Sequence, residues 1–412
     1  MRFALGVGSC SIALTYMQLT HGLHLAYCTN IHRGETWAQT FGTLKEFTLK
    51  VRDRVSAGKP YAIGLRLGEQ ASRELSEAAR LTEFRKWLDQ ENCYVFTING
   101  FPYGSFHGTR VKEQVYAPDW TTEERVVYTN RLFDLLAEIV PSGVEGSIST
   151  VPCSFKEFIT SEAQVGAMRR NLWRTVEHIA KVSERTGKKL HLGLEPEPLC
   201  YLETSTEMVE FYNQMRAERP KDARLGEHLG VNYDNCHLAI EYEEPGEVIA
   251  RFKANGVKIS KLHFSSALKV RPTPEVRAAL RSFVDTVYFH QVIERDAQGA
   301  IKRYKDLDVA LDAAAGWTTS PEEQRKLEWR IHFHIPLHSA PTAIYESTSD
   351  HIQGVMDILA KEPGLCPHIE METYTWEVMP EAMKKRDVVE QLVNEYEWTL
   401  GELGRRGIKI KG

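Results

Sequence analysis

Short apolar runs alternate along the chain with longer segments in which apolar residues recur every three or four positions. The apolar runs begin near eight positions: Leu23, Tyr61, Cys93, Val144, Leu190, Leu229, Val257 and His368. Their starts lie 38, 32, 51, 46, 39, 28 and 111 residues apart, so all intervals but the last fit one strand followed by one helix. This alternation predicts parallel strands with helical crossovers, and eight such strands predict an α/β fold, the (β/α)8 or TIM barrel.

The segments between the apolar runs carry helix signals. Thr121 with Glu124, and Thr204 with Glu207, have the spacing of a capping box, in which a hydroxyl and a carboxylate satisfy free amides at a helix start. Amphipathic helices are expected over about 71–90, 161–186, 274–283, 348–361 and 383–404. A doubly wound open sheet is the alternative, but no G-x-G-x-x-G and no P-loop motif follows any predicted strand.

The long last interval predicts an insertion over about 265–340, between strands seven and eight. Within it, the runs 287–295 and 301–304 are joined by Asp296-Ala297-Gln298-Gly299, which indicates a β-hairpin, and the run 329–336 is expected to pair beside it. Because the insertion leaves from the carboxyl end of a strand, we expect it to lie over the barrel mouth. The expected organisation is one barrel domain over 21–412, preceded by a leader over 1–20.

Composition narrows the setting and the partners. Lys and Arg total 51 against 56 Asp and Glu, a net charge of −5, so the chain lacks the basic field that binds nucleic acid, and a small-molecule metabolite is the expected partner. Seven cysteines without a C-x-x-C pair favour a reducing, cytoplasmic setting. Polar residues interrupt the apolar run in 1–20, which favours a non-secreted leader, and no window is apolar enough for a membrane span.

Acidic and imidazole side chains close four consecutive predicted strands. Glu195, Asp234, His263 and Glu372 each come at the carboxyl end of strands five to eight. Because those ends meet at one mouth of a barrel, the sequence predicts three carboxylates and one imidazole around a single ion. Such ligands favour Mn²⁺, Mg²⁺, Co²⁺ or Zn²⁺. Glu370 is the main rival to Glu372, and Glu197, two residues past Glu195, is expected to be structural or substrate-facing.

Period-two alternation yields a second layer of residues beneath these ligands. Lys261 shares a strand face with His263, and Glu370 shares one with Glu372. Neither charge can stay buried without a partner. We therefore predict that Lys261 and Glu370 pair beneath the ion and orient Glu372.

Several blocks of the sequence resemble a known family. LHLGLEPEP (190–198), VNYDNCH (231–237), KLHF (261–264) and IEMETYTW (369–376) resemble the metal-site strands of the xylose-isomerase-like barrels, the sugar isomerase and epimerase superfamily. YCTNIHRGETW (27–37), NGFPYGSFH (99–107) and WRIHFHIP (329–336) are similar to one branch of it, the EboE-type metabolite-traffic proteins. The resemblance runs from about Leu23 to the end of the chain.

The resemblance implies roles for individual residues. Glu195, Asp234, His263 and Glu372 match the superfamily's metal ligands, and His237 matches a histidine that contacts a substrate oxygen. In an active isomerase the ion polarises a carbonyl and its neighbouring hydroxyl, and Glu195 and Glu372 are candidates to carry the proton between carbons. The cationic residue usual after the strand-seven histidine is absent, because a five-residue apolar and serine segment precedes Lys269 and Arg271. This departure argues against ordinary free-sugar isomerisation.

Other residues are candidates for the pocket wall. Asn99 closes strand three, and Tyr103, Phe106 and His107 follow it as a ring-binding set, with loop packing as the alternative. From the insertion, His334 is the candidate for contact with metal or substrate, and His290 and His338 are weaker ones. Residues that close strand one are expected to reach inward as well: Thr29, Asn30 and His32.

Two classes of function remain open at this point. The first is a metal-dependent isomerase or epimerase acting on a small polyol or sugar-like metabolite. The second is a non-catalytic binding or hand-over protein that uses the same mouth to carry a biosynthetic intermediate, with partner proteins of the same pathway. A metal-dependent nuclease is a distant third, because the acidic balance argues against a phosphodiester polymer.

Overall fold

The computed structural model describes residues 18–56, 58–104, 112–379, 384 and 387–411. The expected leader over 1–20 lies outside these residues except for its last three. Phe106 and His107 also lie outside them, so the structure does not place these two pocket candidates. No helix in the described ranges is long and apolar enough to cross a membrane.

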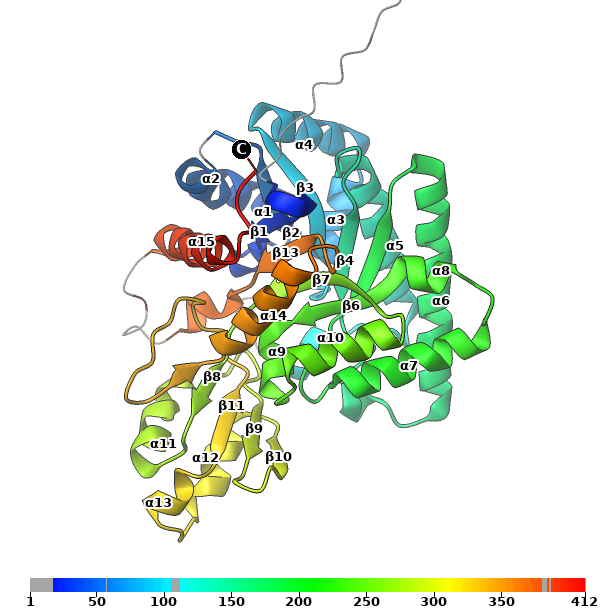
Figure 1. Ribbon diagram of the computed structural model, residues 1–412. Helices are drawn as coiled ribbons and strands as arrows, with labels where there is room; N and C mark the ends of the chain where they lie inside the picture. Colours follow the sequence, from blue (N-terminus) through cyan, green and yellow to red (C-terminus); the bar gives the residue numbers. More distant parts are fainter. Residues whose placement is uncertain (1–17, 57, 105–111, 380–383, 385–386, 412) are drawn as a thin grey trace, which may run out of the picture.

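Eight parallel strands form the centre of the molecule (Figure 1). They are β1 His24–Tyr27, β2 Tyr61–Arg66, β3 Cys93–Asn99, β4 Gly146–Thr150, β5 Leu190–Leu194, β6 Leu229–Asp234, β7 Lys258–Phe264 and β13 His368–Met371. The hydrogen-bonded order is β1-β13-β7-β6-β5-β4-β3-β2, and a parallel bridge between Cys28 and Gly64 closes the sheet. The predicted (β/α)8 barrel is confirmed, and every strand begins within two residues of its predicted start.

Helices cover the outside of the barrel, which is why its strands are buried on both faces and nearly continuously apolar. The α-helices of this layer are α1 Trp37–Thr43, α2 Leu49–Val55, α3 Glu69–Leu75, α4 Ala78–Gln90, α5 Glu123–Ile139, α6 Glu162–Thr186, α7 Ser205–Glu218, α8 Arg224–His228, α9 Asn235–Ile240, α10 Pro245–Ala254, α14 Ser349–Lys361 and α15 Val388–Arg405. A π-helical turn, Leu44–Thr48, joins α1 to α2, and 3-10 turns occupy Thr20–Gly22, Thr29–Ile31, Lys112–Tyr116, Lys156–Phe158 and Tyr374–Val378.

Two helix predictions need correction. The stretch predicted as one helix over 71–90 is broken into α3 and α4. Thr121 does not cap α5, because its amide and hydroxyl both hydrogen-bond to Asp119; the residue before the helix is Thr122, whose side chain makes no capping bond. The capping box of Thr204 with Glu207 at the start of α7 is confirmed.

The chain between β7 and β13 builds a second, antiparallel sheet in the order β10-β9-β11-β8-β12. Its strands are β8 Leu268–Val270, β9 Val292–Arg295, β10 Ile301–Tyr304, β11 Glu328–Ile331 and β12 Glu346–Ser347, and its helices are α11 Pro274–Leu280, α12 Leu307–Ala315 and α13 Pro321–Gln324, with a 3-10 turn at Arg281–Phe283. The predicted hairpin is confirmed as β9 and β10, and β11 pairs with β9 as expected. Trp329 and Leu311 help form a separate hydrophobic core, and Figure 1 shows this part extending from one edge of the barrel.

Candidate metal centre

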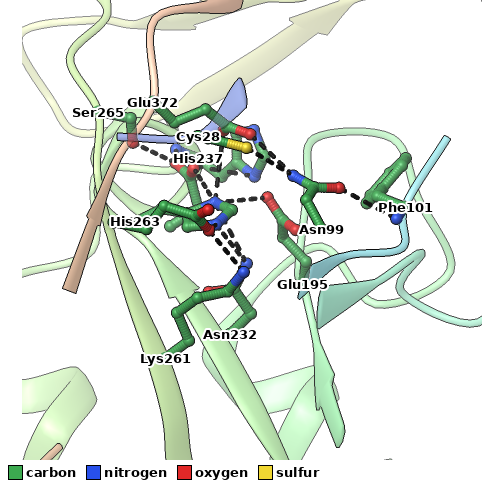
Figure 2. Close-up of polar contacts among 12 residues, drawn as sticks. Cys28, Asn99, Phe101, Glu195, Asn232, His237, Lys261, His263, Ser265 and Glu372 are labelled. Atoms are coloured by element: carbon green, nitrogen blue, oxygen red, sulfur yellow. Dashed lines mark hydrogen bonds and ion pairs between the residues drawn. The ribbon is translucent and has the colours of Figure 1, made fainter. Parts of the chain in front are cut away.

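The carboxyl ends of four neighbouring strands bring Glu195, Asp234, His263 and Glu372 together. Figure 2 labels Glu195, His263 and Glu372 of this group. One ligand atom from each lies within 4.8 Å of all the others, and the four residues are at most 4% exposed. These residues are 177 positions apart at the extremes of the sequence, and only the barrel closure makes them neighbours. The gathering expected from the strand ends is therefore present.

His263 is oriented by contacts on both ring nitrogens. Its Nδ1 faces three carboxylates, 3.2 Å from Oε1 of Glu195 and 3.4 Å from both Oδ2 of Asp234 and Oε2 of Glu372. Its Nε2 lies 2.9 Å from Oε2 of Glu370. A histidine that donates one N–H to a carboxylate presents its other nitrogen in a fixed direction, which is the usual support for a metal-binding imidazole.

A buried ion pair lies directly beneath the four residues. Nζ of Lys261 is 2.6 Å from Oε2 of Glu370, and both side chains are at most 1% exposed. The predicted pair is confirmed, but its predicted action on Glu372 is wrong. Glu370 pairs in register with His263 on the adjacent strand, so its carboxylate supports that imidazole instead.

Two asparagines hold Glu372 in place. Nδ2 of Asn30 donates to Oε1 of Glu372 at 2.7 Å, and Nδ2 of Asn99 donates to the same oxygen at 3.2 Å. Asn30 was among the strand-one residues expected to reach inward. The other two, Thr29 and His32, make structural hydrogen bonds instead. The Thr29 hydroxyl accepts a hydrogen bond from the Arg66 amide, and His32 hydrogen-bonds to the hydroxyl of Tyr27.

The three carboxylates of the centre shift the pKa values of the groups around them. Burial alone raises the pKa of the Asp234 carboxyl, yet the neighbouring imidazoles of His237 and His263 hold that pKa well below its ordinary value. Burial alone lowers the pKa of His263, but the carboxylates of Glu372 and Glu195 raise it well above its ordinary value. Negative charge is thus concentrated around Nδ1 of His263.

Two carboxylate oxygens in the centre are left without hydrogen bonds. Oε2 of Glu195 and Oδ2 of Asp234 are buried and have no hydrogen-bonding partner among the described residues. By contrast, Oδ1 of Asp234 accepts bonds from the Ser265 hydroxyl at 2.7 Å and from the amide of His237 at 2.9 Å. An unsatisfied buried carboxylate oxygen is costly, and a divalent cation coordinated by oxygen and imidazole is what such a donor set fits.

A cavity opens above the centre. Glu195 and Glu372 line it, so both expected proton carriers face the space that a ligand would occupy. Much of the remaining wall is apolar or aromatic: Phe101, Val115, Tyr116, Tyr288, Phe289 and Tyr374. Figure 2 shows Asn99, at the end of β3, and Glu195, just after β5, both approaching the centre; β4 lies between these two strands.

Several pocket predictions are corrected by the structure. Tyr103 does not line the cavity, because its ring packs 5.0 Å from that of Tyr128. His290 is buried against Phe333 within the inserted part, and His338 is half-buried and is not a cavity-lining residue.

The remaining predicted residues lie at the cavity or next to it. Glu197 and His237 line it. His334 lies beneath its wall, with Nδ1 3.0 Å from the carbonyl oxygen of Glu372.

Lys112 is a cavity residue that sequence reasoning missed. It lines the wall and pairs with Asp306 of the inserted part, whereas Lys269 pairs with Glu346 and Arg271 with Glu328, outside the cavity. The positively charged side chain at the cavity wall therefore comes from the segment after β3, and not from Lys269 or Arg271 after β7. Lys112 lies in the connection after β3, where no periodic pattern in the sequence signals which side chains turn inward.

Comparisons with known proteins agree on the fold. No family model matches the chain, and no curated protein matches it. Among solved structures it is similar to a xylose isomerase-like TIM barrel protein from Mycobacterium smegmatis in complex with magnesium (TM-score 0.51, 15% identity, 93% of this chain and 97% of that chain). It is also similar to D-psicose 3-epimerase with D-tagatose from Clostridium cellulolyticum H10 (TM-score 0.51, 12% identity, 93% of this chain and 99% of that chain). A third similar structure is an L-ribulose 3-epimerase (TM-score 0.50, 11% identity, 93% of this chain and 96% of that chain). At these identities the likeness shows the fold alone, and the EboE-type resemblance stays a prediction.

Proposed function

We propose that the chain is a divalent-cation-dependent isomerase or epimerase that acts on a small polyol or sugar-like metabolite. The observation that carries the proposal is the pair of carboxylate oxygens without hydrogen bonds, on Glu195 and Asp234, in a buried four-residue cluster of which Glu195 and Glu372 line a cavity. The fold neighbours include sugar epimerases and a magnesium complex, which agrees with this class of chemistry.

The residues that would hold the cation are Glu195, Asp234, His263 and Glu372. Manganese, magnesium, cobalt and zinc all suit three carboxylates with one imidazole. When bound there, the cation supplies Lewis acidity to a substrate carbonyl and its neighbouring hydroxyl. Asn30, Asn99 and Glu370 keep Glu372 and His263 in fixed orientations.

Glu195 and Glu372 are the proposed proton carriers. Both face the cavity, and the carboxylate of each has an oxygen close to Nδ1 of His263. Glu372 is restrained by two amide donors on Oε1, whereas Oε2 of Glu195 has none. A base needs an oxygen that can accept a proton from substrate carbon, and both residues line the cavity, so both stay candidates to remove it.

The cavity wall favours a ligand with an apolar or ring-shaped part beside its hydroxyl groups. Aromatic faces suit stacking on such a part, and the few polar groups of the wall lie near the centre. This distribution agrees with the departure at Lys269 and Arg271, which argued against an ordinary free sugar.

A binding or hand-over protein is the second candidate, and one observation favours it. His237, the residue expected to contact substrate oxygen, has a protein atom close to each ring nitrogen: Nδ1 lies 3.0 Å from the carbonyl oxygen of Pro196, and Nε2 lies 3.1 Å from Nε2 of His332. In this version the chain carries a biosynthetic intermediate for partner proteins of its pathway, as the EboE-type resemblance implies, in a cytoplasmic setting.

Hydrogen exchange at carbon separates the two candidates. The metal-loaded full chain is incubated in deuterated water with a panel of ketoses and ring-bearing keto-polyols, and deuterium next to the carbonyl is measured by mass spectrometry. An isomerase incorporates deuterium, and the Glu195→Gln variant loses this while the Lys269→Ala variant, altered outside the cavity, retains it. Saturable binding without exchange supports the carrier, and neither binding nor exchange across the panel overturns both.

A further inference from the structure

His237 and His332, which we call the imidazole pair, approach each other beside the cavity. Their Nε2 atoms are 3.1 Å apart, and each residue is 3% exposed. His237 lies on α9, just after β6, whereas His332 follows β11 of the inserted sheet. The contact therefore joins the barrel to the insertion.

The proton of His237 is fixed by its other nitrogen. Nδ1 lies 3.0 Å from the carbonyl oxygen of Pro196, and a carbonyl oxygen can only accept a hydrogen bond. Nδ1 must therefore carry the proton. In the neutral ring Nε2 then carries a lone pair and no proton.

The proton of His332 is fixed through Gln291. The amide nitrogen of Gln291 donates to the carbonyl of Pro198 at 3.2 Å, which settles that its Oε1 faces Nδ1 of His332, at 2.7 Å. Because Oε1 can only accept, Nδ1 of His332 donates, and its Nε2 also presents a lone pair. The Tyr374 hydroxyl is 3.4 Å from that Nε2, at the limit of a hydrogen bond.

Two nitrogen lone pairs 3.1 Å apart repel each other unless a positive charge lies beside both. We propose that the imidazole pair and Glu197 bind a second divalent cation, of the zinc or cobalt class, next to the first. Two nitrogens bound at about 2.05 Å to one tetrahedral ion are roughly 3.3 Å apart, close to the distance in the structure. A proton shared by the two rings is the competing occupant.

Glu197 supplies the carboxylate of this second site. One ligand atom each from Glu197, His237 and His332 lies within 4.8 Å of the others, and all three residues line the cavity. Two imidazoles with one carboxylate suit zinc and cobalt better than magnesium or calcium. Three protein ligands leave a coordination position for a ligand oxygen, which is the arrangement of a catalytic rather than a structural site.

Each imidazole also has the support that metal-binding histidines commonly show, an N–H held by a carbonyl-type oxygen on the far side of the ring. His334 adds a third ring nearby, 5.4 Å from His332 and 5.9 Å from His237 between ring centres. Its Nδ1 is held by the carbonyl of Glu372, and its buried Nε2 has no hydrogen-bonding partner among the described residues.

The second site shares no ligand with the first, so the two can be tested separately. The full chain is stripped with a chelator and titrated with Co²⁺ at pH 7.5, and bound cobalt is counted by equilibrium dialysis alongside its absorption spectrum. We expect two cobalt ions per wild-type chain. His332→Ala is expected to bind one ion fewer and to lose the tetrahedral cobalt bands, and His263→Ala is expected to lose the other ion. Glu197→Gln is expected to lower the affinity for one of the two cobalt ions by at least about tenfold.

The matched control is His290→Gln, another buried histidine of the inserted part, which is expected to keep the wild-type count. An unchanged cobalt count in His332→Ala overturns the second site and favours the shared proton. If His332→Ala fails to fold by circular dichroism, an unchanged affinity in Glu197→Gln decides against the site. Loss of cobalt in His332→Ala but not in His263→Ala supports the second site and contradicts the centre on which the proposed function rests.

Discussion

Lys261 and Glu370 form a fully buried ion pair inside the barrel, with Nζ 2.6 Å from Oε2. Removing Lys261 leaves the buried Glu370 carboxylate without its ammonium partner and with only the contact to Nε2 of His263. Lys261→Met is therefore expected to lower the free energy of unfolding by about 3–5 kcal/mol. The double variant Lys261→Met, Glu370→Leu is expected to recover much of that loss in urea denaturation. A double variant no more stable than the single one contradicts this account.

A glycine gives Glu370 its space. A Cβ at Gly64 would lie 2.1 Å from Oε1 of Glu370 and 2.6 Å from the carbonyl oxygen of Tyr27, and the backbone contact cannot move aside. Gly64→Ala is expected to destabilise the chain by about 1–3 kcal/mol in urea denaturation. The control is Gly42→Ala, where a Cβ meets nothing within 4 Å and the helix is expected to gain about 0.5–1 kcal/mol. Equal effects of the two substitutions would refute the steric explanation.

The amide of Asn30 orients a proposed ligand. Asn30→Ala removes the 2.7 Å hydrogen bond to Glu372, so the carboxylate gains freedom that cation binding must then remove. We expect affinity for Mn²⁺ or Co²⁺ at the first site to fall about 10–100-fold by calorimetric titration. Asn213→Ala, which alters an amide bonded to Asn255, serves as the control and should bind like wild type. Indistinguishable affinities for the two variants would show that Asn30 does not position Glu372.

Buried histidines predict a loss of stability in mild acid. Burial lowers the pKa of His24 to about 4 and of His351 to about 3. The unfolded chain, with a histidine pKa near 6.5, binds protons first as the pH falls. Stability is therefore complete above about pH 6.5 and is lost from there down toward the folded values, by about 2 kcal/mol per histidine at pH 5.

Urea denaturation at pH 7.5, 6 and 5 measures this loss. His351→Gln removes one of the buried histidines that titrate and can keep a hydrogen bond to the hydroxyl of Tyr233, so its stability should fall less steeply with pH. Identical slopes for the variant and the wild type would exclude His351 as a source.

The inner layer of the barrel was predictable because it depends only on local alternation. Residues two apart on one strand share a face, so Lys261 and Glu370 could be placed beneath His263 and Glu372 without knowledge of the strand pairing. The direction of the Glu370 carboxylate depends on that pairing. β13 and β7 set Glu370 opposite His263, and such register between distant strands has no local signal in the sequence.

The cavity wall was less predictable for a related reason. Lys112 and Tyr116 lie on a short 3-10 turn, and Gln291 lies just before β9. At neither place does a periodic pattern tell which side chains face the barrel. The tautomer of His332 depends on Gln291 and on a carbonyl 93 positions away from it. Contacts of this kind form only when the barrel and the inserted sheet have both folded and packed together.

The bridge between Cys28 and Gly64 has a consequence for how the cylinder opens. Every other neighbouring pair of barrel strands is joined by three or more residue pairs, so the join between β1 and β2 has the fewest main-chain links to break. Transient separation should begin there, and amide deuteration followed by proteolytic mass mapping would detect it as early labelling of this edge. Gly64 at this edge lies next to Glu370. Transient opening between β1 and β2 would therefore let water reach the buried Lys261–Glu370 ion pair before the outer helices unfold.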